Sequence, residues 1–214
     1  MTLTFKDLYN EITGQAWSMF DGEVESKEEF ETSVTTSIQK ALADLWFSYE
    51  FSFRKRYQYI KTRVNKYDYS LPNGQIDRKS VSYNNEELGY LATTKGLDDK
   101  VGEPEYFYIS KNKLCLYPIP DSTYTVEVEY LSTMPACNKD SEEISNLKED
   151  TDYINIDTDT EDLFKNTLLP LAMMYLIASE TDENYSAYAW QYERAFKKLK
   201  KYSEQLKQER VIGW

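Results

Sequence analysis

Carboxylates are the most numerous side chains in this sequence that could carry out chemistry. Asp and Glu account for 37 of the 214 residues, and some are adjacent, as in Asp98-Asp99 and Glu142-Glu143. Two carboxylates that flank a glycosidic bond can hydrolyse it. At this density, however, adjacent acids arise without any catalytic need, so the pairs favour a solvated surface over an active site. A carboxylate-dependent cell-wall hydrolase is thus the less favoured, alternative function.

A second acidic segment has the spacing of a calcium-binding loop in part. Oxygen-bearing side chains alternate from Asn155 through Asp157 and Asp159, as a hard cation requires. Counted from Asn155, the sixth position is Thr160 instead of Gly, and the twelfth is Asn166 instead of Glu. We therefore predict no metal site here. The pattern favours an acidic helix N-terminus, which the helix dipole stabilises.

Other common chemistries lack the residues they need. Histidine is absent, which excludes imidazole-based triads, His-ligated metals and histidine pH switches. None of the 7 glycines forms a phosphate-binding loop. Cys115 and Cys137 are too few for a disulfide framework, and Cys115 lies between two leucines, which predicts a packed thiol. We expect no enzyme, no cofactor and no metal.

One basic stretch is interleaved with tyrosines, at Arg54, Lys55, Arg56, Tyr57, Tyr59, Lys61 and Arg63. Such a stretch could follow a phosphate backbone or face an acidic partner, so we mark its cations as a possible interface or DNA-facing surface. The 25 basic and 37 acidic residues give a net charge of −12, which argues against a broad nucleic-acid grip. A solvated strand whose cations pair with the excess acids is the favoured interpretation.

Residues 1–53 are predicted to form N-terminal helices. Thr4 can cap a short helix that Gly14 is placed to end. Ser26 and Glu29 form a capping box. Behind them, apolar residues recur every three or four positions and predict one buried stripe, at Phe30, Val34, Ile38, Ala41, Leu42, Leu45, Trp46 and Tyr49.

Residues 54–135 are predicted to form an inserted antiparallel β-domain. Runs rich in β-branched and aromatic residues predict strands over 57–64, 67–71, 76–83, 105–109, 113–117 and 123–130. Pro72-Asn73-Gly74 is a turn with the Asn-Gly dipeptide typical of hairpins. In the last strand, Val126 and Val128 fall on one face with Tyr124 and Tyr130, which predicts a half-buried strand.

The chain then continues as an acidic connection over 136–158, expected to be irregular, and as C-terminal helices over 159–214 that pack with 1–53. Pro170 predicts a kink or break in the first of these helices. Lys197 to Lys201 suit the last turn of the second, beside the negative end of its dipole. The segment Val211–Trp214 is expected to lie past the helix. The fold class is α+β, with a helical bundle body and an inserted antiparallel β-domain.

We expect neither a signal peptide nor a membrane span. Lys6 and Asp7 interrupt the N-terminal apolar residues. The longest apolar run, 168–178, is shorter than the roughly 20 residues that a span requires. The chain contains 19 tyrosines, a residue type enriched where proteins meet. Together with the apolar C-terminal segment, they predict interfaces instead of a reaction site.

The order of features resembles the head-to-tail adaptor (connector ring) proteins of short-tailed phages, including crAss-like phages. The resemblance spans nearly the whole chain and is densest from Tyr67 to Pro135. The matching segments are Leu45–Tyr49, Tyr69–Pro72, Gly102–Pro104 with Tyr106 and Tyr108, Leu114–Asp121, the alternating strand from Tyr124 to Tyr130, and Met134-Pro135. Two predicted C-terminal helices complete the order.

The resemblance implies a structural virion protein of the neck or tail, assembled in the host cytoplasm. Such adaptors form a ring of twelve copies that docks on the portal protein, extends the DNA channel and offers a platform to further tail or ring proteins. Genomic DNA would pass without specific binding, and no membrane is involved. A neck or tail completion protein that binds elsewhere in the virion is the alternative within this class.

The C-terminal segment is the candidate docking site. Val211, Ile212 and Trp214 are apolar and have no core of their own in the predicted arrangement. They would gain contacts only by docking on the portal or on a neighbouring copy, as tails that order on binding do. A net charge of −12 per copy would also make a channel wall that repels DNA. A nucleic-acid binder that uses Arg54 to Arg63 is a further alternative.

Overall fold

The chain folds as two compact units. The computed structural model describes residues 2–17, 19, 26–177 and 183–212. One unit, the helical unit, comprises Met1–Arg54 and Met134–Trp214, and the other, the β-unit, comprises Lys55–Thr133. The β-unit is therefore an insertion between two halves of the helical unit, and the fold class is α+β.

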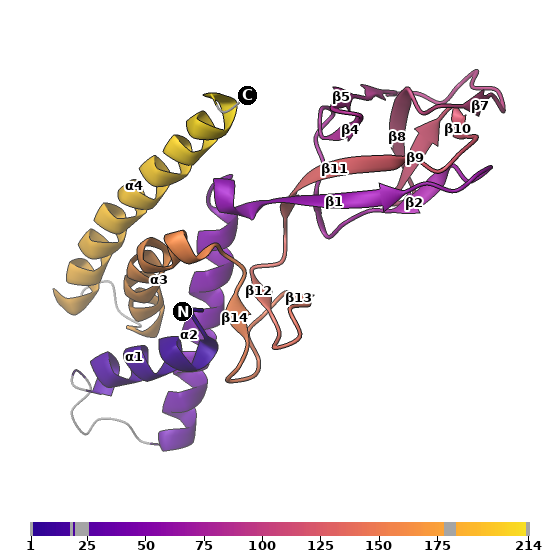
Figure 1. Cartoon of the computed structure of the whole chain (residues 1–214). Coiled ribbons are helices and arrows are strands. Elements are labelled where there is room, and N and C mark those ends of the chain that lie inside the picture. The colour runs from indigo at the N-terminus through magenta and orange to yellow at the C-terminus, as the bar shows by residue number, and fades with distance from the viewer. Residues whose placement is uncertain (1, 18, 20–25, 178–182, 213–214) are drawn as a thin grey trace. The chain divides into compact units, whose positions relative to one another are not determined.

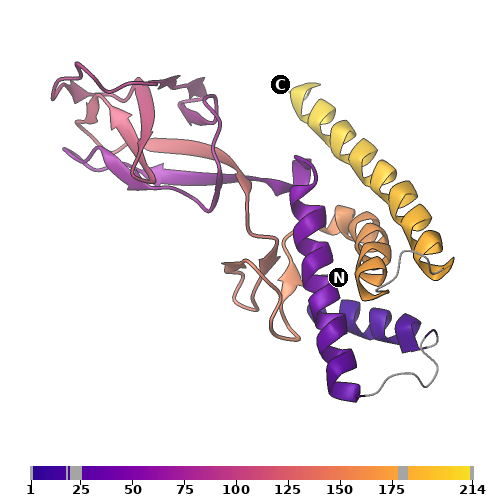
Figure 2. The ribbon, with the colours of Figure 1, turned by 180° about the vertical axis from the view of Figure 1, so that it is seen from behind.

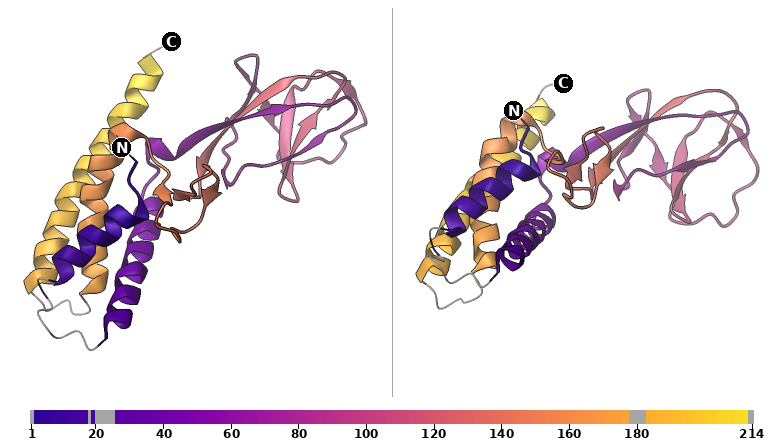
Figure 3. Two further views of the ribbon diagram at one scale, coloured as in Figure 1. Left: turned by 60° about the horizontal axis from the view of Figure 1, so that its bottom comes forward. Right: turned by 90° about the horizontal axis from the view of Figure 1, so that it is seen from below.

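Four helices build the helical unit, α1 (Phe5–Trp17), α2 (Lys27–Phe47), α3 (Glu161–Leu176) and α4 (Glu183–Ile212), with short 3-10 turns at η1 (Ser52–Arg54) and η2 (Thr158–Thr160). Both predicted N-caps are confirmed. The Thr4 hydroxyl accepts a hydrogen bond from the Asp7 amide at 3.2 Å, and the Ser26 hydroxyl accepts one from the Glu29 amide at 3.3 Å. In Figure 3, α3 and α4 lie side by side, and α1 lies across α2 and α3.

The expected helix end at Gly14 and a break at Pro170 are both wrong. Gly14 does not end α1, which continues to Trp17 because Ala16 is buried and the Trp17 ring packs edge-on against Phe30 at 5.8 Å. Pro170 does not break α3, which is one helix from Glu161 to Leu176. The residues on either side of Pro170 are buried in the core, so packing offsets the missing hydrogen bond.

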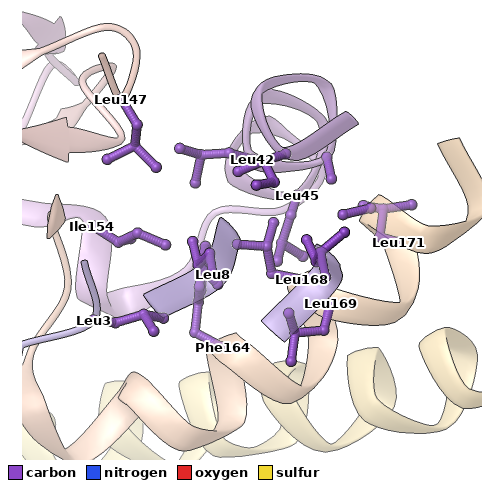
Figure 4. Close-up of a cluster of buried hydrophobic side chains, with 14 of the residues drawn as sticks. Leu3, Leu8, Leu42, Leu45, Leu147, Ile154, Phe164, Leu168, Leu169 and Leu171 are labelled. Carbon is purple, nitrogen blue, oxygen red and sulfur yellow. The ribbon is translucent and has the colours of Figure 1, made fainter. Parts of the chain in front are cut away.

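The core of the helical unit closes between segments from both ends of the chain. All the apolar residues predicted from Phe30 to Trp46 are buried. They meet residues of α1 and α3, as Figure 4 shows for Leu8, Leu45 and Leu168. Aromatic rings extend this core: Phe53 stacks on Phe51 at 4.8 Å and meets Phe164 edge-on at 5.6 Å.

The acidic connection is more ordered than expected. It contains three short strands, β12 (Ala136–Cys137), β13 (Glu143–Ile144) and β14 (Tyr153–Ile154), in the order β13-β12-β14. Leu147 and Ile154 are 0% and 1% exposed and enter the core (Figure 4). The buried Asp152 carboxylate accepts hydrogen bonds from two backbone amides of the preceding loop, at 2.7 and 2.9 Å. A few apolar anchors therefore fix a mostly polar segment.

Two sheets form the β-unit (Figure 1). The first has the order β1-β11-β4-β5, with β3 also paired to β11, and its strands are β1 (Lys55–Lys61), β3 (Gly74–Gln75), β4 (Val81–Tyr83), β5 (Glu86–Glu87) and β11 (Thr125–Ser132). The second has the order β2-β9-β8-β6, from β2 (Asp68–Ser70), β6 (Gly89–Tyr90), β8 (Tyr106–Ser110) and β9 (Lys113–Tyr117). A parallel pair, β7 (Val101–Gly102) and β10 (Ile119–Pro120), completes the unit. The alternation in β11 is confirmed, since Val126 and Val128 are fully buried.

The Asn73-Gly74 turn connects the two sheets. It does not form a hairpin, because β2 pairs with β9 and β3 pairs with β11. A Cβ atom on Gly74 would lie 2.3 Å from the Tyr130 ring and 2.6 Å from the Leu131 carbonyl oxygen. Glycine is therefore required here for close approach to β11.

The aromatic core of the helical unit should dominate its stability. Phe53→Ala removes a ring that is 1% exposed, so we expect it to lower the free energy of unfolding by about 3–5 kcal/mol. Phe47→Ala is the control, since Phe47 is 54% exposed, and it should cost much less. Urea unfolding followed by circular dichroism measures both. Equal losses would contradict the described packing.

Stability should also fall at high pH through Tyr175. Its hydroxyl donates a hydrogen bond to the Asp44 carboxylate, which together with burial raises the pKa of Tyr175 to about 12 from its ordinary value near 10. The folded state thus holds this proton more tightly than the unfolded state, so the contribution is present below about pH 10 and is lost as the pH rises to about 12. The unfolding free energy of Tyr175→Phe should fall less over this interval than that of the wild type. Identical slopes would contradict the assignment.

Candidate interaction surfaces

The described residues offer several surfaces that could contact a partner. Within them, no group of three or more Asp, Glu or Cys side chains is placed to hold a metal ion. Cys115 is a packed thiol, as predicted, and burial raises its pKa. At the calcium-like segment, Asn155 donates hydrogen bonds to the Met134 carbonyl and the Glu143 carboxylate. Glu161 and Asp162 occupy the first turn of α3, where the helix dipole favours them.

Arg54 does not belong to an exposed basic surface, contrary to the prediction. The residue is 3% exposed. Its Nη1 donates hydrogen bonds to the carbonyls of Trp46 at 3.0 Å and Tyr49 at 3.2 Å. Its guanidinium carbon lies 5.7 and 5.3 Å from the ring centroids of Trp46 and Phe47. Burial lowers its pKa. Arg54 therefore satisfies carbonyls at the C-terminal end of α2, and DNA cannot reach it in this fold.

The remaining cations of the basic stretch lie on or just after β1. Lys55 forms an ion pair with Glu129 at 2.6 Å, and Arg56 Nη1 donates a hydrogen bond to the Lys55 carbonyl. Lys61 and Arg63 are exposed. They line a groove of about 290 Å³ beside Tyr59, which is 64% exposed. Pairing with acids thus accounts for Lys55, while Lys61 and Arg63 remain open to a partner.

The C-terminal candidates lie at the end of α4 and beyond it. Helix α4 continues to Ile212, so the expectation that Val211 and Ile212 lie past the helix is wrong. Figure 2 shows the helix from behind, with its C-terminal end marked. Trp214, like the side chains of Val211 and Ile212, lies outside the described residues.

A surface on α4 was missed by the sequence reasoning. Four exposed cations and one exposed tryptophan follow one face of the helix, and we call them the α4 stripe: Trp190, Arg194, Lys197, Lys198 and Lys201. The positions i, i+4, i+7, i+8 and i+11 share one helical face, and this spacing could have revealed the stripe. The helix dipole does not explain these cations, because the helix continues well past Lys201.

A second groove lies between α1 and α3, and it is acidic, whereas the groove beside Tyr59 is lined by cations. It measures about 480 Å³ and is lined by Asp7, Glu11, Glu161, Asp162 and Lys165, together with Thr2, Leu3 and Asn10. Lys165 forms an ion pair with Glu11 at 2.5 Å, so acids remain in excess around it. We call this the acidic groove.

Exposed aromatic side chains and grooves of opposite charge are characteristic of a protein that assembles with other proteins. Within the described residues, none of the helices is long and apolar enough to cross a membrane. A search of curated proteins finds no match. The family comparison specifies the class: residues 4–211 match the model of the family described as SU10 adaptor protein. The chain belongs to this family of phage head-to-tail adaptors and is a structural component of the virion.

The buried role assigned to Arg54 can be tested by stability. Arg54→Ala removes the guanidinium that donates to the Trp46 and Tyr49 carbonyls, and we expect a loss of about 2–3 kcal/mol in the free energy of unfolding. Arg63→Ala, at an exposed position of the same basic stretch, should change it little. Urea unfolding of both variants provides the measurement. A larger loss for Arg63→Ala would contradict the assignment.

Proposed function

We propose that this chain forms a ring that docks on the portal, extends the DNA channel and provides a platform for further tail proteins. The observation that carries the proposal is the family match, which covers residues 4–211 and hence both units. The proposal therefore concerns both units and not one of them alone.

The inserted architecture supports a protein with more than one partner. Each unit has its own hydrophobic core, so each can present a surface without relying on the other for folding. In the β-unit, Tyr57 and Tyr59 are 45% and 64% exposed along β1. In the helical unit, Trp190 is 61% exposed. Large exposed aromatics of this kind are the usual anchors of interfaces.

The C-terminal end of α4 is the proposed portal-docking element. Val211, Ile212 and Trp214 supply the apolar side chains. Because α4 continues to Ile212, the first two would enter the contact from a preformed helix. A preformed helix loses less conformational entropy on binding than a disordered segment does. Many equivalent contacts around a ring would then multiply a modest single affinity.

The charge of the chain supports passage of DNA without specific binding. The net charge is −12, and repulsion between acids and phosphates opposes adhesion of DNA. Two cations of the basic stretch are also unavailable, because Arg54 is buried and Lys55 is paired with Glu129. We therefore place no specific DNA contact on this stretch.

Removing the last four residues tests the docking element. A chain that ends at Arg210 should keep the circular dichroism and unfolding free energy of the full chain, because the core that the structure describes lies before this point. It should lose binding to the purified cognate portal in a pull-down assay. The control is Trp17→Ala, which removes an aromatic side chain that is 60% exposed elsewhere in the helical unit and should bind normally. Portal binding by the shortened chain would overturn the docking assignment.

A further inference from the structure

The α4 stripe borders a groove that its own unit leaves open. The groove measures about 380 Å³ and lies between α3 and α4, where Leu163 and Asn166 face Trp190, Arg194 and Lys198. Trp190 is 61% exposed, and the Arg194 guanidinium carbon lies 5.4 Å from the centroid of its ring. A large aromatic ring, an apolar floor and two cations thus form one surface, which we call the Trp190 groove.

The stripe has no role in holding α4 on its own unit. The opposite face of the helix does that, since Leu199 and Ser203 are fully buried there. The Tyr192 and Phe196 rings stack on each other, with centroids 5.5 Å apart, and both pack against the core. Within the described residues, neither Arg194 nor Lys198 forms an ion pair. In a chain with a net charge of −12, two unpaired cations beside an exposed tryptophan favour an acidic protein surface as partner.

The helical unit itself carries such a surface. The acidic groove holds four carboxylates and one lysine. It shares α3 with the Trp190 groove but uses a different flank: Asp162 and Lys165 line the acidic groove, while Leu163 and Asn166 line the Trp190 groove. The two grooves therefore lie on different flanks of one helix.

We propose that the Trp190 groove of one copy docks against the acidic groove of the next copy. A contact between two different surfaces of the same chain is heterologous, so a copy bound through one groove keeps the other free, and assembly closes into a ring when the rotation between copies allows it. The inference rests on the proposed ring function and specifies its contact between copies. One face of α4 thus binds a neighbouring copy, while the end of the same helix is left for the portal.

Site-specific cross-linking of the chain alone tests this contact. A photoreactive phenylalanine replaces Trp190, and unlabelled and nitrogen-15-labelled chains are mixed at high protein concentration, so that mixed-isotope products identify links between copies. We expect links to peptides of α1 and of the first turns of α3. The same amino acid in place of Trp17 is the control, because Trp17 is exposed to a similar extent, 60%, and lies outside both grooves. It should give few of these links.

Charge reversal makes the test specific. Arg194→Glu/Lys198→Glu and Asp162→Lys each damage one groove at exposed positions. Each variant alone should lose most of the links between copies, and an equimolar mixture should recover them, because each variant retains the groove that the other lacks. Links that survive in either variant alone, or that fail to recover in the mixture, would overturn the proposal.

The test does not depend on the portal. If the chain with the photoreactive residue at position 190 and otherwise unchanged grooves gives no links between copies but still binds the portal, only the inference about copies is overturned. If that chain links to its neighbours but does not bind the portal, only the docking function is overturned. If position 190 cross-links to no second copy, in the free chain or with the portal present, the proposal is wrong. Capture of duplex DNA through the stripe, with no link between copies, would likewise overturn it.

Discussion

The pairing of β1 with β11 is the constraint on which the rest of the structure depends. The two strands run antiparallel for seven residue pairs, with Lys55 opposite Leu131 and Lys61 opposite Thr125. The first residue of the β-unit therefore lies beside one of its last, and the chain enters and leaves this unit at neighbouring points. Because of this register, the helices on both sides of the insertion can pack into one core. Helices α1 and α2 come before the insertion, and α3 and α4 come after it. A single closed core then leaves whole helix faces free for partners.

The packing of the core determines which faces of α3 and α4 are exposed to partners. Helix α4 places Leu199 and Ser203 in the interior, which leaves the opposite side to Trp190 and the cations of the α4 stripe. Helix α3 is buried along Phe164 and Leu168, and its two exposed flanks line the acidic groove and the Trp190 groove. The same packing that stabilises the helical unit thus produces two surfaces of opposite charge. An adaptor needs such surfaces more than it needs a reaction pocket, since it acts by joining other proteins.

Local patterns predicted much of this fold. The apolar spacing from Phe30 to Trp46 and the alternation in β11 each reflect a single buried face, so they could be identified without tertiary information. The caps at Thr4 and Ser26 are equally local. The predictions that failed depend on non-local contacts. Packing against the core carries α1 past Gly14 and keeps α3 continuous at Pro170. Two apolar anchors order the acidic connection. Of the candidate surfaces, the burial of Arg54 required knowledge of α2 and its neighbours. The α4 stripe was also missed, although the helical spacing of its residues could have predicted it.

Mass photometry of the purified chain, alone and then mixed with the cognate portal, tests the adaptor assignment most directly. We predict that the chain is a monomer or weakly associated when free, and that it adds to the portal as a fixed set of copies. A single discrete increase in mass would give the number of copies that bind one portal. A chain that stays unbound when mixed with the cognate portal would contradict the adaptor assignment and direct attention to a site elsewhere in the virion.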